Sequence, residues 1–517
     1  MSDQGDEQGA VIAFLSRGEA YGKPGVPVER IDTHASVVFL IEDRVYKLKR
    51  SIRYTYLDYS SEKKRQVACE AELRLNRRTA PTLYRAVRAV TLDQNGAFAL
   101  DGMGPPVDWL VEMTRFPQDQ LFDRLAENRL LTPAIMRELG DEIAAFHQTA
   151  EICESGGGSA GMRVTIDGNE ANLRLAGDLL DRAKVDSWRA ASGAALRRLA
   201  SLLDRRRAGG KVRHCHGDLH LGNICLYEGK PVLFDGIEFN EAFTCIDRLY
   251  DFAFVLMDLD HRGLDALGAV LFNRYFDLSG ESDGLAALPL FLSVRAAVRA
   301  HVSIAAIAQQ KDGTKKRLLA KDAAAYLDSA LSLLEPAKPC LIAVGGFSGS
   351  GKSTFAQTLA PDFLPVPGAR LLRSDVLRKR LAGVAPETRL PPTAYTKNMT
   401  DKIYTTLYEE AAASLAAGYS AIADAAFLES SERIEIAAVA ARAKVPFCGF
   451  WLEAPAEKLR ERVAARTGDA SDADLAVLER QLTYQLGPLD WTRLDAGGDV
   501  EKSVAAARRH LSGKDEA

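Results

Sequence analysis

The segment from Leu341 to Thr354 constrains the fold more than any other, because it places a glycine-rich turn between an apolar strand and a helix. The turn reads G-x-x-x-x-G-K-S from Gly346 to Ser353. Its glycines let successive backbone N–H groups face one anion, the lysine adds positive charge, and the serine hydroxyl can bind the Mg²⁺ that accompanies ATP. We therefore predict an ATP-binding loop with contacts from Gly346, Ser348, Gly349, Ser350, Gly351, Lys352, Ser353 and Thr354.

The chain has 517 residues, which is too long for one ordinary core. Two prolines, Pro336 and Pro339, precede the ATP-binding loop, so we place a boundary there and predict domains over residues 1–335 and 336–517. Strand-like runs and then helical periodicity in the first domain predict a small β-rich lobe followed by a large helical lobe. Alternating strands and helices in the second predict an α/β domain with a parallel sheet.

Charge and cysteine usage limit the class of protein. The chain carries 66 Lys and Arg against 70 Asp and Glu, and neither half has the basic excess of a general nucleic-acid binder. Its 7 cysteines are widely spaced and form no C-x-x-C pair, which favours reduced thiols in the cytoplasm over a disulfide framework. No run approaches the roughly 18 uninterrupted apolar residues of a membrane span, so we expect no membrane partner.

A second phosphate-handling pattern lies upstream, where His216-Gly217-Asp218 is followed by Asn223 and, after a short strand, by Asp235. Phosphoryl transfer needs a carboxylate that deprotonates the attacking hydroxyl and oxygen ligands that hold Mg²⁺ against the ATP phosphates. This H-G-D-x-H-x-x-N segment resembles aminoglycoside phosphotransferase and choline kinase-like enzymes, which have a protein-kinase-like fold. The resemblance implies that Asp218 is the catalytic base and that Asn223 and Asp235 bind magnesium.

Zinc binding is an alternative for the same segment. Imidazole and thiolate groups are preferred zinc ligands, and His214, Cys215, His216 and His220 are all close in sequence. Their spacing matches no established zinc motif, and the alternative leaves Asp235 unexplained.

The resemblance extends to the first hundred residues. Lys47 ends a strand where such kinases place the lysine that contacts the ATP phosphates, and Glu70 on the next helix is its predicted partner. Lys49 and Glu72 are close alternatives, since residues two apart on a strand face the same way. The strand that ends with Glu112 and Met113 resembles the adenine-binding hinge. Further on, Asp251 is expected to brace the catalytic loop and Asp247 to cap a helix.

The second domain carries its own candidate base. Asp375 follows a strand and Arg378 lies one helical turn later, a D-x-x-R pattern that resembles polynucleotide kinase, chloramphenicol phosphotransferase and zeta-toxin relatives. The resemblance implies that the aspartate takes a proton from the acceptor hydroxyl and that the arginine holds an anionic group. Asp424 ends a buried-looking strand and is predicted to act on Mg²⁺. A segment resembling the arginine-bearing lid of these kinases contributes Arg462 and Arg466, four residues apart and predicted to share a helix face near the transferred phosphoryl group.

The whole chain resembles bacterial two-part proteins that join an aminoglycoside phosphotransferase-like domain to a P-loop domain. We therefore predict a bifunctional ATP- and Mg²⁺-dependent phosphotransferase that acts on small-molecule hydroxyl acceptors in the cytoplasm. One alternative is a single catalytic domain whose neighbour binds ATP as a regulator. Another is a polynucleotide-end kinase, which the balanced charge disfavours. The identity of the acceptor and the oligomeric state stay open.

Overall fold

The computed structural model describes residues 3–54, 57–466 and 468–513, which divide into two compact units. The first unit comprises Met1–Leu131, Ala145–Gly161 and Arg205–Val255; the second comprises Thr132–Ala144, Met162–Asp204 and Leu256–Ala517. Four helices contribute residues to both units, namely α4 (Pro133–Thr149), α5 (Gly158–Arg174), α6 (Arg182–Ala208) and α7 (Arg248–His261). The predicted boundary after residue 335 stays a prediction.

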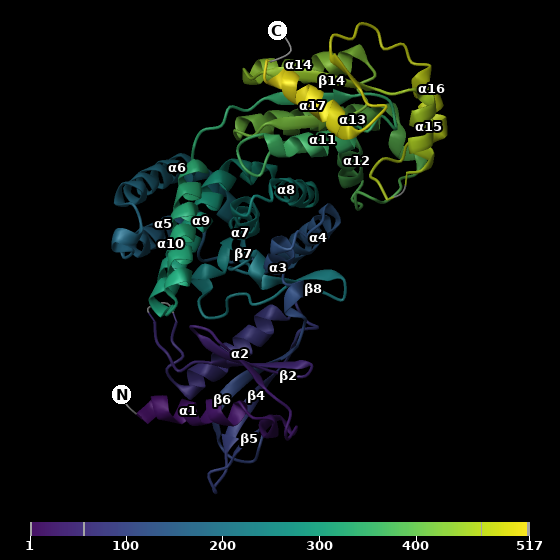
Figure 1. Ribbon diagram of the computed structural model, residues 1–517. Helices are drawn as coiled ribbons and strands as arrows, with labels where there is room; N and C mark the ends of the chain where they lie inside the picture. The colour runs from purple at the N-terminus through teal and green to yellow at the C-terminus, as the bar shows by residue number, and fades with distance from the viewer. Residues whose placement is uncertain (1–2, 55–56, 467, 514–517) are drawn as a thin grey trace. The chain divides into compact units, whose positions relative to one another are not determined.

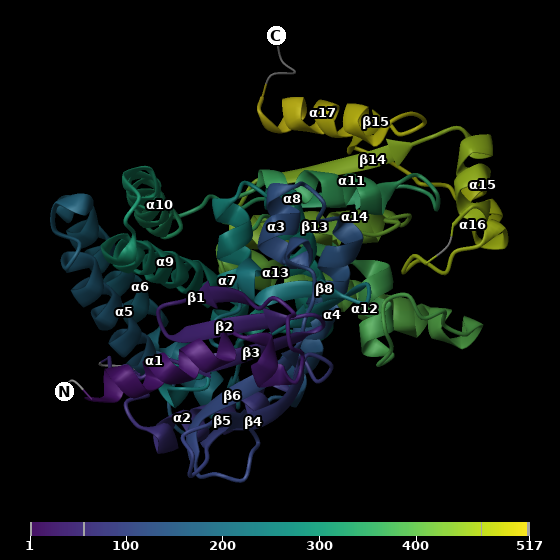
Figure 2. The ribbon, with the colours of Figure 1, turned by 60° about the horizontal axis from the view of Figure 1, so that its bottom comes forward.

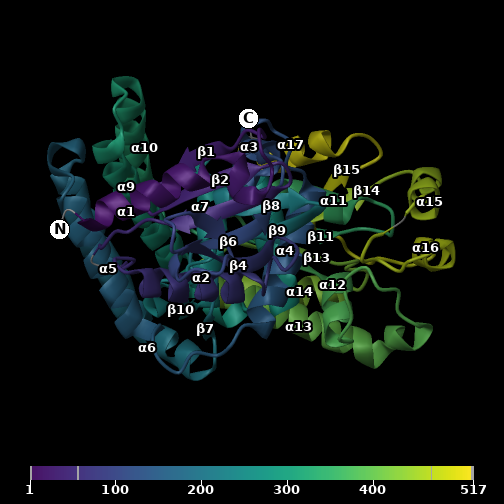
Figure 3. The ribbon, with the colours of Figure 1, turned by 90° about the horizontal axis from the view of Figure 1, so that it is seen from below.

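The first unit is built on an antiparallel sheet in the order β1-β2-β3-β6-β4-β5. Its helices and strands are α1 (Asp3–Leu15), β1 (Glu29–Asp32), β2 (Ser36–Ile41), β3 (Arg44–Lys49), α2 (Glu62–Asn76), β4 (Tyr84–Leu92), β5 (Phe98–Leu100), β6 (Pro106–Thr114), α3 (Phe122–Glu127), β7 (Val212–His214), β8 (Ile224–Tyr227), β9 (Lys230–Leu233) and β10 (Cys245–Asp247) (Figure 1). Apolar residues of α1 pack on one face of the sheet, and those of α2 pack on the other (Figure 3).

The second unit contains a five-stranded parallel sheet in the order β12-β13-β11-β14-β15. Its elements are α8 (Asp265–Ser279), α9 (Leu288–Gln309), α10 (Gly313–Ser332), β11 (Leu341–Gly345), α11 (Lys352–Leu359), β12 (Arg370–Arg373), α12 (Ser374–Leu381), α13 (Lys397–Ala416), β13 (Ala421–Asp424), α14 (Ser430–Ala443), β14 (Phe447–Glu453), α15 (Ala456–Ala464), α16 (Leu475–Leu482), β15 (Thr492–Asp495) and α17 (Val500–Leu511). Successive residues of a strand face opposite sides, so two cores form. One core joins the sheet to α13 and α14, the other to α11 and α17 (Figure 2). The predicted fold class is confirmed for both domains.

The disulfide between Cys153 and Cys245 contradicts the expectation of reduced thiols for this pair. The cause is pairing around β7: β10 runs antiparallel to β7, and the segment after α4 bonds to β7 through the Cys153 N–H and the Val212 carbonyl, 3.1 Å apart. Residues 92 positions apart therefore meet, with 5.7 Å between their Cα atoms. The other five cysteines are free.

One apolar segment of the second unit, Ser282–Ala308, is long enough to cross a membrane by length and composition alone. Its most apolar window is 56% buried against protein. Within this segment the Ser293 hydroxyl accepts a hydrogen bond from Trp188 Nε1 at 3.1 Å, and the Val294 carbonyl accepts one from Asn169 Nδ2 at 3.1 Å. Such burial and polar bonding are typical of a core helix in a globular protein.

Helix α8 covers the free edge of strand β12. The Asn273 amide bonds the strand as a neighbouring strand would: its Oδ1 accepts from the Leu371 N–H at 2.7 Å, and its Nδ2 donates to the Ala369 carbonyl at 3.2 Å. Arg370 on the strand donates to Asn273 Oδ1 at 2.8 Å and to Asp277 at 2.5 Å. An uncovered edge strand exposes unpaired backbone groups. The edge strand of the parallel sheet is thus covered by α8, a helix that comes before all of the sheet's strands in the sequence.

Replacing Asn273 with leucine is expected to loosen the β12 edge. The apolar side chain leaves the Leu371 N–H and Ala369 carbonyl buried without partners, and each such group costs about 1–3 kcal/mol. Hydrogen–deuterium exchange at the Leu371 amide is expected to accelerate by about tenfold or more, because each 1.4 kcal/mol is about a factor of ten. Asn172→Leu, at an exposed position, is the control and leaves that exchange unchanged. Equal Leu371 exchange in the Asn273 variant and the wild type contradicts the edge role.

Candidate functional sites

The first candidate site centres on Lys47, which lies within strand β3, two residues before its end. Its Nζ lies 2.5 Å from Asp235 Oδ1 and 3.0 Å from Glu72 Oε1. Burial alone would lower the pKa of Lys47, but Asp235 and Glu72 raise it well above the ordinary value, so the side chain stays charged. The structure thus places Lys47 beside the metal-binding candidate Asp235, while its contact with the ATP phosphates stays a prediction.

The predicted partner Glu70 is wrong, and the alternative Glu72 takes its place. Glu70 is exposed and accepts a hydrogen bond from Gln66, whereas Glu72 is fully buried between Lys47 and Lys49. Residues two positions apart on an α-helix are separated by about 200° of rotation around its axis, so these two carboxylates point to opposite sides of α2. Burial favours the neutral acid, but the two lysines lower the pKa of Glu72 to about 2.

Glu72→Gln is expected to destabilise the first unit far more than Glu70→Gln. Losing the carboxylate leaves two buried ammonium groups with one fewer counter-charge, and breaking a buried ion pair costs about 3–5 kcal/mol. An exposed substitution such as Glu70→Gln is expected to change stability by less than about 0.5 kcal/mol. The midpoint of urea unfolding, followed by fluorescence, measures both. Equal midpoints for the two variants would show that the ion pair with Glu72 does not stabilise the protein.

The catalytic-loop candidate Asp218 is held beside Asn223. The Asn223 Nδ2 donates to both the backbone carbonyl and the Oδ2 of Asp218, each at 2.9 Å. This bonding fixes the amide orientation and turns the Asn223 Oδ1 away from Asp218, where it can serve as a metal ligand. His220 Nε2 lies 3.4 Å from the same carboxylate oxygen.

The expected brace Asp251 is fully buried behind this loop. Its two oxygens accept the backbone N–H groups of His216 at 3.1 Å and Gly217 at 2.8 Å, and one oxygen also bonds His147 Nε2 at 3.0 Å. Charged acceptors make strong hydrogen bonds, so the backbone just before Asp218 is fixed. Asp247, the expected helix cap, accepts from the Leu249 N–H at 2.9 Å and pairs with Arg206 at 2.7 Å.

The zinc alternative fits this geometry poorly. Among the described residues, the ligand-type side chains that gather within 4.8 Å of one another are His147, Cys215 and Asp251. Only Cys215 belongs to the set considered from the sequence. His216 instead bonds the Phe234 carbonyl through Nε2 at 2.9 Å. Burial lowers the pKa of His216, which keeps the imidazole neutral in this position.

Two residues that the sequence analysis missed hold the metal-binding candidate Asp235. The Asp235 N–H donates to the Tyr84 hydroxyl at 3.1 Å, and the next amide, of Gly236, donates to Asn76 Oδ1 at 2.7 Å. Asn76 returns a bond to the Gly236 carbonyl at 3.3 Å. Asp235 has a φ of +60°, a left-handed conformation that this bonding maintains. Neither partner belongs to a motif.

The Glu112 side chain does not face the Lys47 site. Lys47 pairs with Val111 across β3 and β6, so Val111 shares its face and Glu112 faces the opposite side of the sheet. There the Glu112 carboxylate bonds Arg88 at 2.7 Å and lies 3.3 Å from Arg44. Met113 lies on the Lys47 face, in the core that α2 covers. The adenine-binding role of Glu112 and Met113 stays a prediction.

The second candidate site begins at the phosphate-binding loop between β11 and α11. Three of its glycines, Gly346, Gly349 and Gly351, have φ values of +143°, +83° and +86°. A Cβ on Gly346 would lie 2.7 Å from the Leu452 carbonyl oxygen, and one on Gly349 would lie 2.7 Å from that of Leu459. Glycine is therefore required at both positions for backbone shape and for space.

Lysine and metal-ligand candidates converge on this loop. Lys352 Nζ donates to the carbonyls of Gly346 at 2.8 Å and Phe347 at 3.0 Å. Burial lowers the pKa of Lys352, while Asp424 and Asp375 act in the opposite direction. The Ser353 hydroxyl donates to Asp424 Oδ2 at 2.6 Å, so the two predicted magnesium ligands are in direct contact.

Asp375 follows β12 in the first turn of α12 and lies close enough to Lys352 and Asp424 for their charges to act on its carboxyl. Burial raises the pKa of the Asp375 carboxyl, and Arg373 and Ser471 counteract part of that rise. A carboxylate with a raised pKa is a better proton acceptor near neutral pH. The predicted base is thus in a suitable environment.

Arg378 does not point into open solvent. It is buried, donates to the Ala394 carbonyl at 2.9 Å, and lies 4.7 Å from the centre of the Tyr395 ring. Its partners belong to the segment between α12 and α13. The role of Arg378 in holding an acceptor stays a prediction.

The shared helix face predicted for Arg462 and Arg466 is wrong, because α15 ends at Ala464. Arg462 donates to the Ala496 carbonyl at 2.8 Å and to the Gly498 carbonyl at 3.2 Å, so it fixes the segment that follows β15. Arg466 lies beyond the helix, where its charge lowers the pKa of Lys352. Arg466 Nη1 is buried and has no hydrogen-bond partner among the described residues, and its contact with a phosphoryl group stays a prediction.

Two residues at the second site were missed. Arg373 donates to Asp469 at 2.9 Å, and its Nε lies 3.5 Å from Asp424 Oδ2, which places a guanidinium beside the metal-ligand pair. Gln481 on α16 accepts the Ser348 N–H at 2.7 Å and so contacts the phosphate-binding loop itself. Arg373 comes two positions before the aspartate of the D-x-x-R pattern, and the sequence indicated only that it lies on a strand.

Several buried polar atoms of the phosphate-binding loop, β12, α12 and the segment after α15 lack a hydrogen-bond partner among the described residues. Within the described ranges, Arg373 Nε, Arg378 Nε, Arg466 Nη1 and Ser350 Oγ are buried and have no hydrogen-bond partner. Leaving a buried donor unsatisfied costs about 1–3 kcal/mol.

Two family models match separate parts of the chain. Residues 31–288 match the family described as "Phosphotransferase enzyme family", and residues 341–487 match the one described as "AAA domain". The uncharacterized proteins Rv2004c of Mycobacterium tuberculosis and Mb2027c of Mycobacterium bovis are each 27% identical over 498 residues, covering 92% of this chain and 94% of the relative.

Solved structures with local likeness include kinases. A choline/ethanolamine kinase family protein from Mesorhizobium loti is 12% identical and covers 63% of this chain and 98% of its own, with a TM-score of 0.36. A gluconokinase from Sinorhizobium meliloti is 20% identical and covers 35% of this chain and 98% of its own, with a TM-score of 0.25. By the family matches, the chain joins a domain of the phosphotransferase enzyme family to a P-loop domain of the AAA type.

Proposed function

We propose that the chain is a bifunctional phosphotransferase with two separate ATP–Mg²⁺ sites, each acting on a hydroxyl of a small molecule. The observation that carries the proposal is that each site has its own complete set of groups. The first combines Lys47 with Asp218, Asn223 and Asp235; the second combines Lys352 with Asp375, Ser353 and Asp424. An ATP-dependent enzyme needs a compartment that contains ATP, so we expect it in the cytoplasm.

Oxygen ligands in both sets suit magnesium. Asn223 and Asp235 would hold the ion in the first site, and Ser353 and Asp424 in the second. Bound Mg²⁺ neutralises charge on the phosphates. Lys47 and Lys352 position the phosphates, while Asp218 and Asp375 accept the proton of the attacking hydroxyl, which then forms a bond to the γ-phosphorus as ADP leaves.

Counting nucleotides tests the proposal directly. Wild-type protein is expected to bind two equivalents of a non-hydrolysable ATP analogue in the presence of Mg²⁺, measured by equilibrium dialysis. Lys47→Ala and Lys352→Ala are each expected to bind one equivalent, and the double variant none. Exposed Lys63→Ala is the control and binds two.

Turnover measurements identify the reactions. Sugars, amino sugars, aminoglycosides, nucleosides and short oligonucleotides are offered with ATP, and each single lysine variant is expected to lose a different product. If one variant loses every product and the other loses none, a single domain is catalytic and the other binds ATP as a regulator. Phosphorylation restricted to oligonucleotide ends contradicts a small-molecule acceptor.

A further inference from the structure

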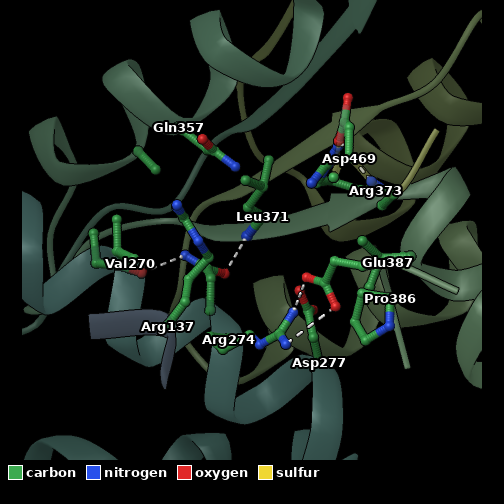
Figure 4. A pocket seen from close by; sticks show the side chains of 16 residues that line it. Arg137, Val270, Arg274, Asp277, Gln357, Leu371, Arg373, Pro386, Glu387 and Asp469 are labelled. Carbon is green, nitrogen blue, oxygen red and sulfur yellow. Dashed lines mark hydrogen bonds and ion pairs between the residues drawn. The ribbon is translucent and has the colours of Figure 1, made fainter. Parts of the chain in front are cut away.

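The charged residues beside strand β12 balance one another. They line a cavity of about 250 Å³ that contains three arginines and three carboxylates, and Figure 4 shows two of the resulting pairs. Arg274 lies 2.7 Å from Glu387, and Arg373 lies 2.9 Å from Asp469. The described lining residues therefore carry no excess charge. The buried charges around Lys49 in the first unit differ, because carboxylates outnumber ammonium groups there.

Lys49 is buried at the end of β3, where its side chain is 1% exposed. Residues two apart on a strand face the same side, so Lys49 lies next to Lys47. Its Nζ is 2.6 Å from Glu72 Oε2 and also donates to Glu238 Oε1. Burial alone would lower the pKa of Lys49, but Glu238 and Glu72 raise it well above the ordinary value, so the side chain stays charged. Lys49 is thus an ammonium group held between two carboxylates.

Glu238, three residues after Asp235, is held by two donors. Its Oε1 accepts from Lys49 and from the Tyr59 hydroxyl, the latter at 2.5 Å, and its side chain is 7% exposed. The Lys49 Nζ also lies 5.0 Å from the centre of the Tyr59 ring. Phe239, the next residue, packs against the apolar cluster that contains Tyr59. The segment that follows Asp235 is therefore attached to β3 and to the segment before α2.

These contacts form a closed ring of charged side chains. In order around the ring they are Asp235, Lys47, Glu72, Lys49 and Glu238, and the first and last belong to one short segment of the chain. Three carboxylates face two ammonium groups, so the ring carries one excess negative charge. Asp235 is its most exposed member, with 41% of its side chain accessible, against 17% or less for the other four. A cation therefore approaches the ring most readily at Asp235.

We propose that Glu238 is a positioning residue of the first site: through Lys49 it holds Asp235 in place to bind magnesium. ATP and Mg²⁺ draw Lys47 toward phosphate oxygens and Asp235 toward the metal, so the direct contact between these two side chains is weakened on binding. The contact between Glu238 and Lys49 uses neither group and persists, which keeps the segment of Asp235 attached to β3. This inference rests on the proposed ATP–Mg²⁺ site of the first unit.

Mg²⁺-dependent binding of the ATP analogue tests the inference without a turnover assay. Lys352→Ala serves as the parent protein, because only its first site is expected to bind nucleotide. Glu238→Gln in this parent is expected to raise the Mg²⁺ concentration for half-maximal binding by about tenfold or more, since loss of a partner behind a metal ligand costs about 10- to 100-fold in metal affinity. At saturating Mg²⁺ one equivalent still binds, whereas damage to the fold lowers binding at every Mg²⁺ concentration. Glu238→Asp keeps the charge and is expected to recover part of the Mg²⁺ affinity.

Lys49→Met tests whether Glu238 acts through Lys49. In a protein that already carries this substitution, Glu238→Gln is expected to cause no further loss of Mg²⁺ affinity, because the connection to β3 is already missing. A further loss of about tenfold in that background shows that Glu238 contacts the metal itself, which overturns the positioning role.

Tyr59→Phe retains every charge of the ring and removes one donor to Glu238, so it is expected to weaken Mg²⁺ binding in the same direction by a smaller factor. It decides the question if the Glu238→Gln protein does not fold, and an unchanged Mg²⁺ dependence in Tyr59→Phe then overturns the inference.

The matched control is Glu241→Gln, an exposed acid three positions after Glu238, which is expected to leave the Mg²⁺ dependence unchanged. Equal half-maximal Mg²⁺ concentrations in the parent and in Glu238→Gln overturn the inference alone, because the parent still binds the analogue. If the Lys352→Ala parent binds no analogue at any Mg²⁺ concentration, the proposed first ATP site is wrong and the inference falls with it.

Discussion

Asp375→Asn is expected to lower phosphoryl transfer at the second site by roughly 10³-fold, within the range that general-base catalysis contributes. Asparagine keeps the size of the side chain, but its amide cannot accept the proton of the attacking hydroxyl. The side chain lies just after β12, where Arg373 and Ser471 already fix its surroundings. Binding of the ATP analogue is expected to stay at two equivalents, since Lys352 and Ser353 are unchanged.

The pH dependence of turnover separates loss of a base from general damage. Burial raises the pKa of Asp375, so its carboxyl becomes protonated at a higher pH than an ordinary aspartate, whose pKa is about 3.9. A protonated carboxyl accepts no proton, so wild-type turnover falls as the pH decreases through this raised pKa. The variant is expected to show a low rate without that acidic limb. Exposed Asp490→Asn serves as the control and keeps both rate and profile.

If Asp375→Asn retains more than about a tenth of the wild-type rate, another group takes the proton, because removal of a general base costs at least about 10²-fold. An unchanged acidic limb in the variant would lead to the same conclusion.

Features confined to a short stretch of sequence were predictable. The glycine-rich turn between β11 and α11 follows from a motif whose spacing sets the geometry, and Asn223 lies beside Asp218, five positions away. In each case the backbone between the residues has one preferred path, so local order determines which side chains meet.

Features that depend on rotation or on distant contacts were not predictable. Glu70 and Glu72 both lie on α2, and only the rotation of this helix about its axis, relative to the sheet, determines which of them faces Lys47. The pleat of β6 turns the Glu112 side chain away from Lys47, which the hinge-like segment alone did not reveal. Asn273 bonds a strand about 100 positions later, and Asp469 reaches Arg373 across 96 positions. No periodicity in a single sequence encodes such pairs, since packing of whole elements selects them.

Asp218→Asn is expected to lower the rate of phosphoryl transfer at the first site by a similar factor, roughly 10³-fold. The structure makes this a clean substitution, because Asn223 Nδ2 donates to the backbone carbonyl of residue 218 as well as to its side chain. The backbone bond survives the change, and an amide oxygen can still accept the other. Asp251 continues to hold the N–H groups of His216 and Gly217. The loop is therefore expected to keep its shape while losing the proton acceptor.

Measuring both products in both aspartate variants distinguishes two independent enzymes from a coupled pair. Independent sites predict that Asp218→Asn leaves the second product unchanged and that Asp375→Asn leaves the first unchanged, with exposed Asp119→Asn altering neither. Should Asp218→Asn also abolish the second product, the first reaction must supply the acceptor of the second. Adding purified first product then restores the second reaction if the sites work in sequence, because Asp375 and its surroundings are intact. Failure of that rescue, with two ATP equivalents still bound, contradicts independent catalysis at the second site.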